Sequence, residues 1–330
     1  MDKKKAAVFL GAGALCLISG VLSLLLGAAK LSPAALWRAL LSGPSSTAGY
    51  IFWYVRLPRT AACLLAGAAL AVSGAVIQGV LNNKLASPSI IGVNAGAGLA
   101  VTVCCAAGLF SGWTIALSAF GGAMLSVLLV VFVAQKTGAS RTTVILGGVA
   151  VNSFLNALSQ GINALFPDSG ALSADFRVGD FSSVVPARLI PAAVLILIAL
   201  AAVFTLCSDL DVLALGEETA RSLGMSVRKM RTLFLILAAM LAGASVSFAG
   251  LLGFVGLIVP HAMRRLVGSE SRFLLPACAL GGAGFVTACD LASRLVFAPQ
   301  ELPVGILLSV LGCPFFLLLL IKRKGGRTND

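Results

Sequence analysis

The chain has 330 residues, of which 59% are hydrophobic and 11% charged, and its mean hydropathy is +1.03. A soluble domain carries about a quarter charged residues, so the composition excludes a secreted domain, a disordered chain and a cytosolic enzyme. The net charge of +12 comes from 24 basic and 12 acidic residues. Because the basic residues stand between apolar runs, they are interpreted as topological anchors in a membrane and not as a nucleic-acid surface.

Charge-free windows long enough to cross a bilayer follow one another along the chain. A transmembrane helix needs about 20 apolar residues, and the windows are 6–29, 60–83, 85–135, 142–167, 189–208, 232–263 and 302–321, with a shorter run at 273–289. Window 85–135 is predicted to break at 111–113. Window 232–263 contains Gly253, Gly256 and Pro260, and it is predicted to hold one full helix, then a break and part of another helix. We therefore expect an all-α polytopic membrane protein with about ten transmembrane helices.

Both ends of the chain are basic, which predicts that both are cytoplasmic and that the number of spans is even. In the ten-span arrangement 17 of the 24 basic residues lie inside. The seven that lie outside are Lys30, Arg38, Arg56, Arg59, Arg177, Arg188 and Arg294.

An internal repeat appears when the sequence is shifted by 172 residues. Each copy has the form V-R-x-x-R-T, an apolar helix and then L-x-x-P, and the copies begin at Val55 and Val227. Five predicted spans separate them, and an odd number inverts the second copy relative to the first. We expect a single transmembrane domain, 1–330, whose halves 1–165 and 166–330 form an inverted repeat.

Window 142–167 carries four amide side chains on one predicted helical face. They are spaced by four, four and three residues and are Asn152, Asn156, Gln160 and Asn163. Amides facing lipid are costly, so the face is predicted to point toward protein or water. It is interpreted as the wall of a translocation path, and the alternative is interhelical hydrogen bonding in a static bundle.

The segment 209–231 is the longest charged stretch on the predicted inside. Glu217 and Arg221 stand four residues apart, in the order that favours a helical ion pair. Gly216 and Gly224 bracket a short amphipathic helix. The segment is either a docking site for a soluble partner or a solvated connector, and the residues alone leave both open.

No catalytic chemistry is predicted. The sequence lacks the G-x-x-x-x-G-K-[ST] motif that binds ATP through a P-loop, and its eight cysteines form no C-x-x-C pair. His261 is the single histidine, so we expect no metal site, no cofactor and no enzyme activity in this chain. The predicted spans also carry no charged residue at mid-membrane, which argues against an ion-coupled secondary carrier.

Several stretches resemble the FecCD-type permeases of ATP-binding-cassette (ABC) importers for iron–siderophore, haem and cobalamin. They extend over nearly the whole chain and include R-L-P-R-T at 56–60, N-N-K-L-A-S-P at 82–88, A-R-S-L-G-M at 220–225, G-F-V-G-L-I-V-P-H at 253–261 and E-L-P-V-G at 301–305. Two positions depart from the family pattern. Lys84 stands where the family usually has proline, and F-R-V-G-D at 176–180 stands where it often has W-x-x-G-S.

The resemblance implies a permease of ten helices that pairs with a second copy or a paralogue in a prokaryotic plasma membrane. It implies that two cytosolic ATPase subunits, which bind ATP and magnesium, dock on the coupling loop 209–231. The coupling residues would be Glu217, Glu218, Ala220, Arg221 and Gly224.

On the outside the resemblance implies a substrate-binding protein, whose acidic residues would meet the docking residues Arg56, Arg59 and Arg294. The fifth helix would line the path, with a cytoplasmic gate at Thr142 and Thr143. The expected cargo is an iron chelate of the siderophore type, with haem or cobalamin as the alternative. The alternatives of another class are an ion-coupled secondary carrier and a membrane-embedded enzyme.

Overall fold

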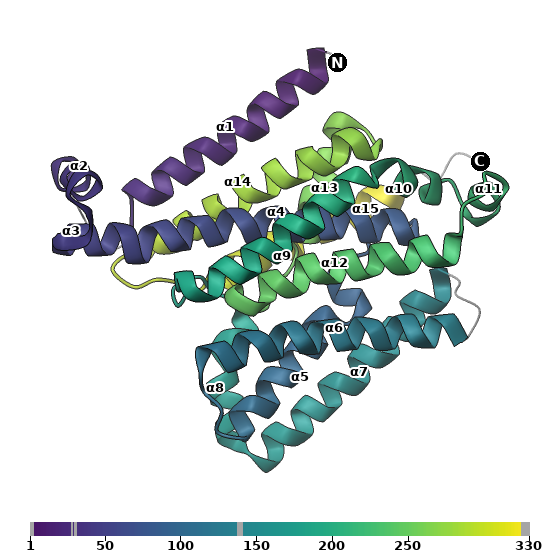
Figure 1. Ribbon diagram of the computed structural model, residues 1–330, viewed down its shortest axis with the longest axis horizontal. Helices are drawn as coiled ribbons and strands as arrows, with labels where there is room; N and C mark the ends of the chain where they lie inside the picture. Colours follow the sequence, from purple (N-terminus) through teal and green to yellow (C-terminus); the bar gives the residue numbers. More distant parts are fainter. Residues whose placement is uncertain (1–2, 28, 30–31, 137–140, 325–330) are drawn as a thin grey trace.

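The computed structural model describes residues 3–27, 29, 32–136 and 141–324, and every regular element in these ranges is a helix (Figure 1). Seven helices are long and apolar enough to cross a membrane. They are α1 (Lys3–Leu25), the continuous helix Thr47–Leu81 that ends in α4 (Leu57–Leu81), α6 (Gly112–Lys136), α7 (Arg141–Leu165), α9 (Pro186–Thr205), α12 (Val227–Ala249) and α14 (Ser271–Leu295). The predicted all-α membrane fold is confirmed.

Shorter helices complete the architecture. Two of them are apolar, α5 (Val93–Ala106) and α15 (Val304–Lys324), and with α13 (Val255–Val267) they bring the total close to the predicted ten. The others connect spans at the two ends of the molecule: α2 (Pro33–Ser42), α3 (Thr47–Tyr50), η3 (Pro88–Ile91), α8 (Pro167–Val178), α10 (Cys207–Ala214) and α11 (Glu217–Ser222). We call these the α2 end and the α11 end, after the helices that mark them in Figure 1.

The break predicted within 232–263 lies at 250–254, around Gly253. Helix α12 ends at Ala249, and α13 begins at Val255 and includes Pro260. Gly250 and Phe254 both have positive φ, at 69° and 64°, a conformation that ends a helix. A Cβ on Gly250 would also meet the carbonyl oxygen of Phe176. Backbone geometry at 250–254 therefore sets the break, and the proline does not.

The helix predicted from the run 273–289 is longer than expected, because α14 continues to Leu295. The helix thereby takes in Asp290 and Arg294, whose side chains are buried. Charged groups inside a span are tolerated when they pair with one another. The two residues form an ion pair of 3.0 Å with each other.

The two halves meet along α4 and α12, which lie side by side and run in opposite directions (Figure 1). The hydroxyl of Ser73 on α4 donates a hydrogen bond of 2.7 Å to the carbonyl oxygen of Ala238 on α12. Helices α2 and α3 precede α4 just as α10 and α11 precede α12, at the same shift of 172 residues. The antiparallel arrangement is what an inverted repeat predicts.

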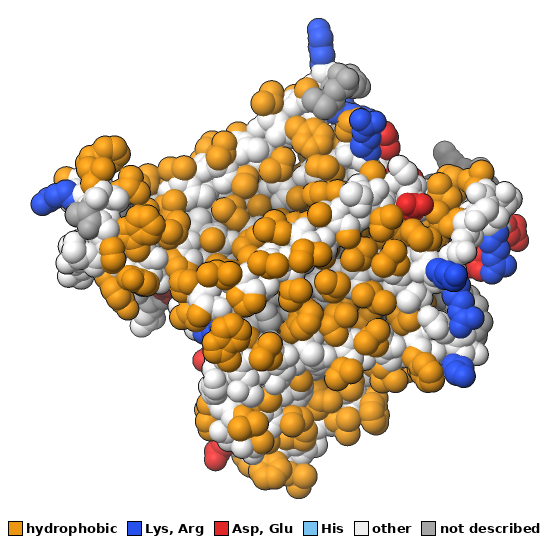
Figure 2. Space-filling view, in the orientation of Figure 1, with side chains coloured by type: hydrophobic (Ala, Val, Ile, Leu, Met, Phe, Trp, Pro, Cys, Tyr) orange, Lys and Arg blue, Asp and Glu red, His pale blue; other side chains and the backbone are white. Residues whose placement is uncertain are grey.

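Burial divides the spans into an inner and an outer group. In α4 78% of the most apolar window is buried, and in α12 and α14 72%, whereas in α1 the fraction is 22% and in α7 28%. Figure 2 shows hydrophobic side chains over most of the visible surface between the two ends. The core is therefore α4, α12 and α14, and the helices around it turn apolar side chains outward, as in a protein solvated by lipid.

Helix α4 approaches α14 most closely at Gly67 and Gly282. A Cβ on either glycine would clash with the carbonyl oxygen of the other, which is the close backbone contact that small residues allow in membrane bundles. Replacing Gly67 by alanine should therefore destabilise the fold by about 1–3 kcal/mol through overpacking.

The measurement is the fraction of detergent-solubilised protein that stays monodisperse in size-exclusion chromatography after heating. The control is Gly13→Ala on α1, where an added Cβ meets nothing within 4 Å. Equal stability of the two variants would contradict a close α4–α14 contact.

Candidate functional site

Helix α7 presents the four predicted amides on one side, but only the middle two are unpaired. The amide nitrogen of Asn152 donates to the carbonyl oxygens of Ser89 and Ile90 in η3, at 2.8 and 3.1 Å. The oxygen of Asn163 accepts from the hydroxyl of Ser169 at 3.0 Å. Asn156 and Gln160 are exposed. Within the part of the chain that is described they make no hydrogen bond, so they are available to a ligand or a second chain.

The predicted gate residues lie in the first turn of α7, at the α11 end. Thr142 is exposed and Thr143 is half-buried. Next to them, Arg141 donates a hydrogen bond of 3.1 Å to the carbonyl oxygen of Leu213 in α10. The start of the amide-bearing helix is thus tied to the segment 209–231, although the gating role stays a prediction.

Glu217 is the residue that ties α11 to the core. Its carboxylate forms an ion pair of 2.6 Å with Arg221 and a second of 3.1 Å with Arg231. The Arg231 side chain is 4% exposed, whereas that of Arg221 is 68% exposed. Only the pair with Arg231 is protected from solvent, and it links the first residue of α11 to the first turns of the buried helix α12.

The remaining predicted coupling residues divide between the surface and the interior. Glu218 and Gly224 are exposed. Ala220 is fully buried, so its side chain packs α11 against the rest of the protein. Two leucines, Leu215 and Leu223, are exposed by 64% and 63% on either side of α11. The outer face of α11 therefore combines apolar and charged side chains, which is typical of a docking surface.

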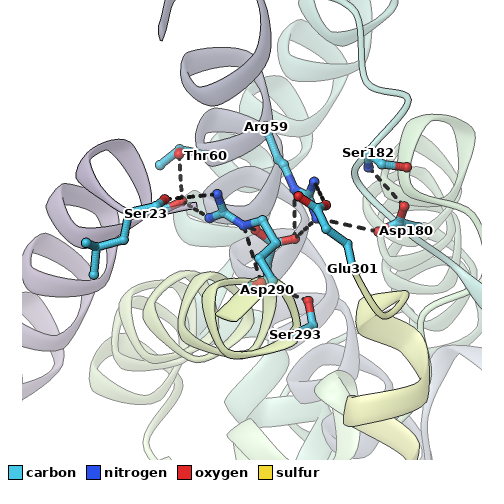
Figure 3. A network of polar contacts seen from close by, with 10 residues as sticks. Ser23, Arg59, Thr60, Asp180, Ser182, Asp290, Ser293 and Glu301 are labelled. Atoms are coloured by element: carbon cyan, nitrogen blue, oxygen red, sulfur yellow. Dashed lines mark hydrogen bonds and ion pairs between the residues drawn. The ribbon is translucent and has the colours of Figure 1, made fainter. Parts of the chain in front are cut away.

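At the α2 end Arg59 lies at the centre of a network of carboxylates (Figure 3). It forms an ion pair of 2.9 Å with Asp290 on α14 and another of 2.6 Å with Glu301, and Asp180 stands 3.8 Å away. Asp290 is fully buried, and it also pairs with Arg294 at 3.0 Å. The network joins α4, α14 and the two loops that carry Glu301 and Asp180.

The two other arginines at this end hold the last turn of α1. Arg56 donates to the carbonyl oxygens of Leu24, Leu25 and Ala29, at 2.9, 2.7 and 2.7 Å. Arg294 donates to the hydroxyl of Ser23 at 2.7 Å. Arginines at a helix C-terminus satisfy carbonyl groups that the helix itself leaves unpaired.

The structure differs from the expectation that these arginines face outward. Arg56, Arg59 and Arg294 are 3%, 5% and 3% exposed, and each has its partners within the chain. The reason is that α14 extends past 289 and places Asp290 between Arg59 and Arg294. Their contact with a binding protein stays a prediction.

Three acidic residues of this network were missed in the sequence. In the sequence Asp290 marks only the end of a short apolar run, and Glu301 and Asp180 stand only as parts of motifs. The spacing of Asp290 and Arg294, four residues apart at the end of an apolar run, is the signal that predicts a helical ion pair. No local signal joins Asp290 to Arg59, because 231 residues separate them.

A polar cavity of about 420 Å³ also opens at the α2 end. It is lined by α8, the loop that follows it and the end of α12, and its charged side chains are Asp175, Asp180 and Arg188. Arg188 donates to the carbonyl oxygen of Ser183 at 2.8 Å. The departure at 176–180 from the family pattern thus lies in the wall of a cavity.

Comparison with known proteins shows the family to which the chain belongs. The model of the FecCD transport family matches residues 15–322. The chain is 38% identical over 319 residues to the iron-uptake system permease protein FeuB of Bacillus subtilis (strain 168), covering 94% of each protein. It is 39% identical over 294 residues to the cobalamin import system permease protein BtuC of Halobacterium salinarum, covering 86% of this chain and 76% of the relative.

The fold has a counterpart among solved structures. A chain from an ABC transporter assigned to the metal-chelate type, solved in an inward-facing conformation, superposes with a TM-score of 0.84 at 28% identity. The match covers 96% of this chain and 99% of the other. Family, length and fold therefore agree. The chain belongs to the FecCD transport family and is a multi-pass permease subunit of an ABC importer, a class in which a separate subunit hydrolyses ATP.

Proposed function

We propose that α7 of this permease lines the translocation path, opposite α7 of a second copy or a paralogue. The observation that carries the proposal is the pair Asn156 and Gln160, which is exposed and has no hydrogen-bond partner within the described chain, in the middle of a membrane-spanning helix. Such amides are costly against lipid, so a water-filled path shared with another subunit is the environment that suits them. The walls are polar but uncharged, and they offer weak contacts to a large solute.

The proposed orientation places both termini and the α11 end in the cytoplasm. Among the described residues, basic side chains gather at this end, where Figure 2 shows several of them. They include Arg141, Arg221, Arg228, Lys229, Arg264, Arg265 and Arg272. Lys30 and Arg327, which the predicted charge bias also counts, lie outside the described residues. The bias follows the positive-inside rule.

In this orientation the ATPase docks on α11, and ATP and magnesium bind to that subunit alone. A displacement of α11 reaches the core through the Glu217–Arg231 ion pair, because Arg231 lies at the start of the buried helix α12. Rigid-body motion of packed helices then opens the path to one side or the other. The assignment as an ABC permease sets aside the ion-coupled carrier and the membrane-embedded enzyme.

The substrate-binding protein docks at the α2 end in the same proposal, over Arg56, Arg59 and Arg294. Glu301 is the most exposed carboxylate of the Arg59 network, with 33% of its side chain exposed. A carboxylate of the binding protein reaches Arg59 by displacing Glu301 from it. Docking would then exchange one ion pair for another and release the loop that carries Glu301.

The proposed cargo is an iron chelate of the siderophore type. It is supported by the similarity to an iron-uptake permease over 94% of both chains. Haem or cobalamin is the second candidate, favoured by the similarity to a cobalamin permease.

The test of the cargo is competitive uptake by the permease assembled with its ATPase and binding protein. Radioactive iron supplied as a siderophore chelate should accumulate, and an excess of cobalamin or haem should leave its uptake unchanged. Accumulation of labelled cobalamin or haem in place of the iron chelate would overturn the assignment of cargo but not that of the path.

Replacing both Asn156 and Gln160 by leucine should lower uptake roughly tenfold, equivalent to about 1.4 kcal/mol at the barrier. The reason is that a hydrated solute loses its polar contacts in the path. The abundance of the protein should not change, because neither side chain has a partner within the described chain.

The control is the exchanged pair Asn156→Gln with Gln160→Asn, which keeps both amides and should retain uptake. ATPase activity is recorded in parallel to separate the path from coupling. Normal uptake by the leucine variant would show that this face of α7 does not line the path.

A further inference from the structure

The segment that contains α2 and α3 turns its large apolar side chains outward. We call these residues the aromatic patch; they are Trp37, Leu40, Leu41, Tyr50, Trp53 and Tyr54. Trp37 is 64% exposed and Leu41 72%. The interior of the same segment is small. It consists of Ala39, which is fully buried, and Phe52, which packs against it.

The outward placement is built into the local fold. Indole nitrogen Nε1 of Trp53 donates a hydrogen bond of 3.1 Å to the carbonyl oxygen of Ala39, which fastens α2 to the start of the long helix. Ser32 and Ser46 cap α2 and α3 through their hydroxyl oxygens. Tyr50 and Tyr54 lie together on the exposed side, with ring centroids 5.0 Å apart. The patch is therefore a defined surface that the described chain leaves uncovered.

Its composition indicates lipid as the occupant. Tryptophan and tyrosine are enriched where a membrane meets water, and a long basic side chain there extends toward the headgroups. Arg38 is the one charged side chain in 33–55, and the sequence has no Asp or Glu between residues 3 and 167. The segment packs against the end of α1 through Leu24, and α1 itself exposes Leu17, Ile18 and Val21.

The inverted repeat supplies a contrast. Helices α10 and α11 stand in the position that corresponds to α2 and α3, at a shift of 172 residues. They carry Asp209, Asp211, Glu217, Glu218 and Arg221, which suits a protein partner in water. At the same shift the first half has uncharged residues in these five positions, namely Trp37, Ala39, Ser45, Ser46 and Gly49.

We propose that the aromatic patch inserts into the boundary between headgroups and acyl chains of the outer leaflet and anchors the start of the helix Thr47–Leu81 there. The leaflet assignment rests on the orientation given under the proposed function. The anchor holds the α2 end of the core helix in the membrane while the α11 end is displaced.

Tryptophan fluorescence tests the proposal, because the chain has three tryptophans. In the double variant Trp53→Phe, Trp113→Phe only Trp37 remains, and the protein is reconstituted in phosphatidylcholine vesicles that contain brominated lipid. Bromine near the carboxyl end of the acyl chain should reduce the Trp37 emission about twofold, and bromine near the methyl end should reduce it less. Aqueous iodide should have little effect.

Three further variants keep the result interpretable. Trp37→Phe with Trp53→Phe leaves Trp113, which lies at the start of α6 and marks interfacial depth. The emission of Trp37 is also obtained as the difference between the single variant Trp113→Phe and the double variant Trp37→Phe, Trp113→Phe. Both of these variants keep Trp53 and its hydrogen bond.

Strong quenching of Trp37 by iodide, or shielding that appears only after the binding protein is added, would overturn the proposal and indicate a protein-docking face. Quenching by lipid does not depend on which leaflet is involved. A reversed orientation would therefore leave the signal intact, and it is detected separately by labelling the chain termini.

Discussion

Replacing Asp290 by alanine should destabilise the permease by about 3–5 kcal/mol, the usual cost of breaking a buried ion pair from one side. Arg59 and Arg294 would remain buried at 5% and 3% exposure with their shared carboxylate removed. Arg59 would keep only Glu301 as a close partner. The measurement is the temperature at which the detergent-solubilised protein loses its monodisperse peak.

Two variants serve as controls for this result. Asp290→Asn keeps the shape and part of the hydrogen bonding, and should lose less stability than alanine. Arg221→Ala removes an ion pair whose arginine is 68% exposed, and surface pairs of this kind contribute little. An Asp290→Ala variant as stable as Arg221→Ala would contradict the view that the network holds the α2 end together.

Replacing Glu217 by alanine should uncouple transport from ATP hydrolysis. It removes the link to Arg231, so that α11 moves without displacing α12. We expect the number of cargo molecules carried per ATP to fall roughly tenfold, which corresponds to about 1.4 kcal/mol of lost coupling. Uptake and phosphate release are measured together on the assembled transporter in proteoliposomes.

Arg221→Ala and Glu218→Ala are the matched controls for this variant. The first breaks only the exposed pair with Glu217, and the second changes a neighbouring carboxylate that is exposed. Both should retain most of the coupling ratio. If all three variants behaved alike, the Glu217–Arg231 pair would not be the element that transmits the motion of α11.

The architecture was largely predictable because membrane spans obey a simple rule. Apolar length and the absence of charge located the seven long helices, and basic residues between them marked the connections. Where the prediction failed, a long-range partner changes the cost of burying a charged residue. Asp290 continues helix α14 because Arg59 pairs with it.

The candidate site was predictable in part. Helical periodicity located the amides of α7 on one face. It could not show that Asn152 and Asn163 are hydrogen-bonded within the chain, while Asn156 and Gln160 have no hydrogen-bond partner among the described residues. The docking arginines were located by motif, and the burial of Arg59 and Arg294 depends on contacts with residues more than 200 positions away. Periodicity describes one helix at a time, so it does not predict which residues on other helices are partners.

The most direct test of the account is uptake by the purified permease with and without its ATPase. The binding protein loaded with iron chelate is placed on the side of the α2 end, and ATP on the side of the α11 end. We predict uptake only when both the ATPase and ATP are present, with no response to an imposed ion gradient. Gradient-driven uptake by the permease without the ATPase would contradict the account.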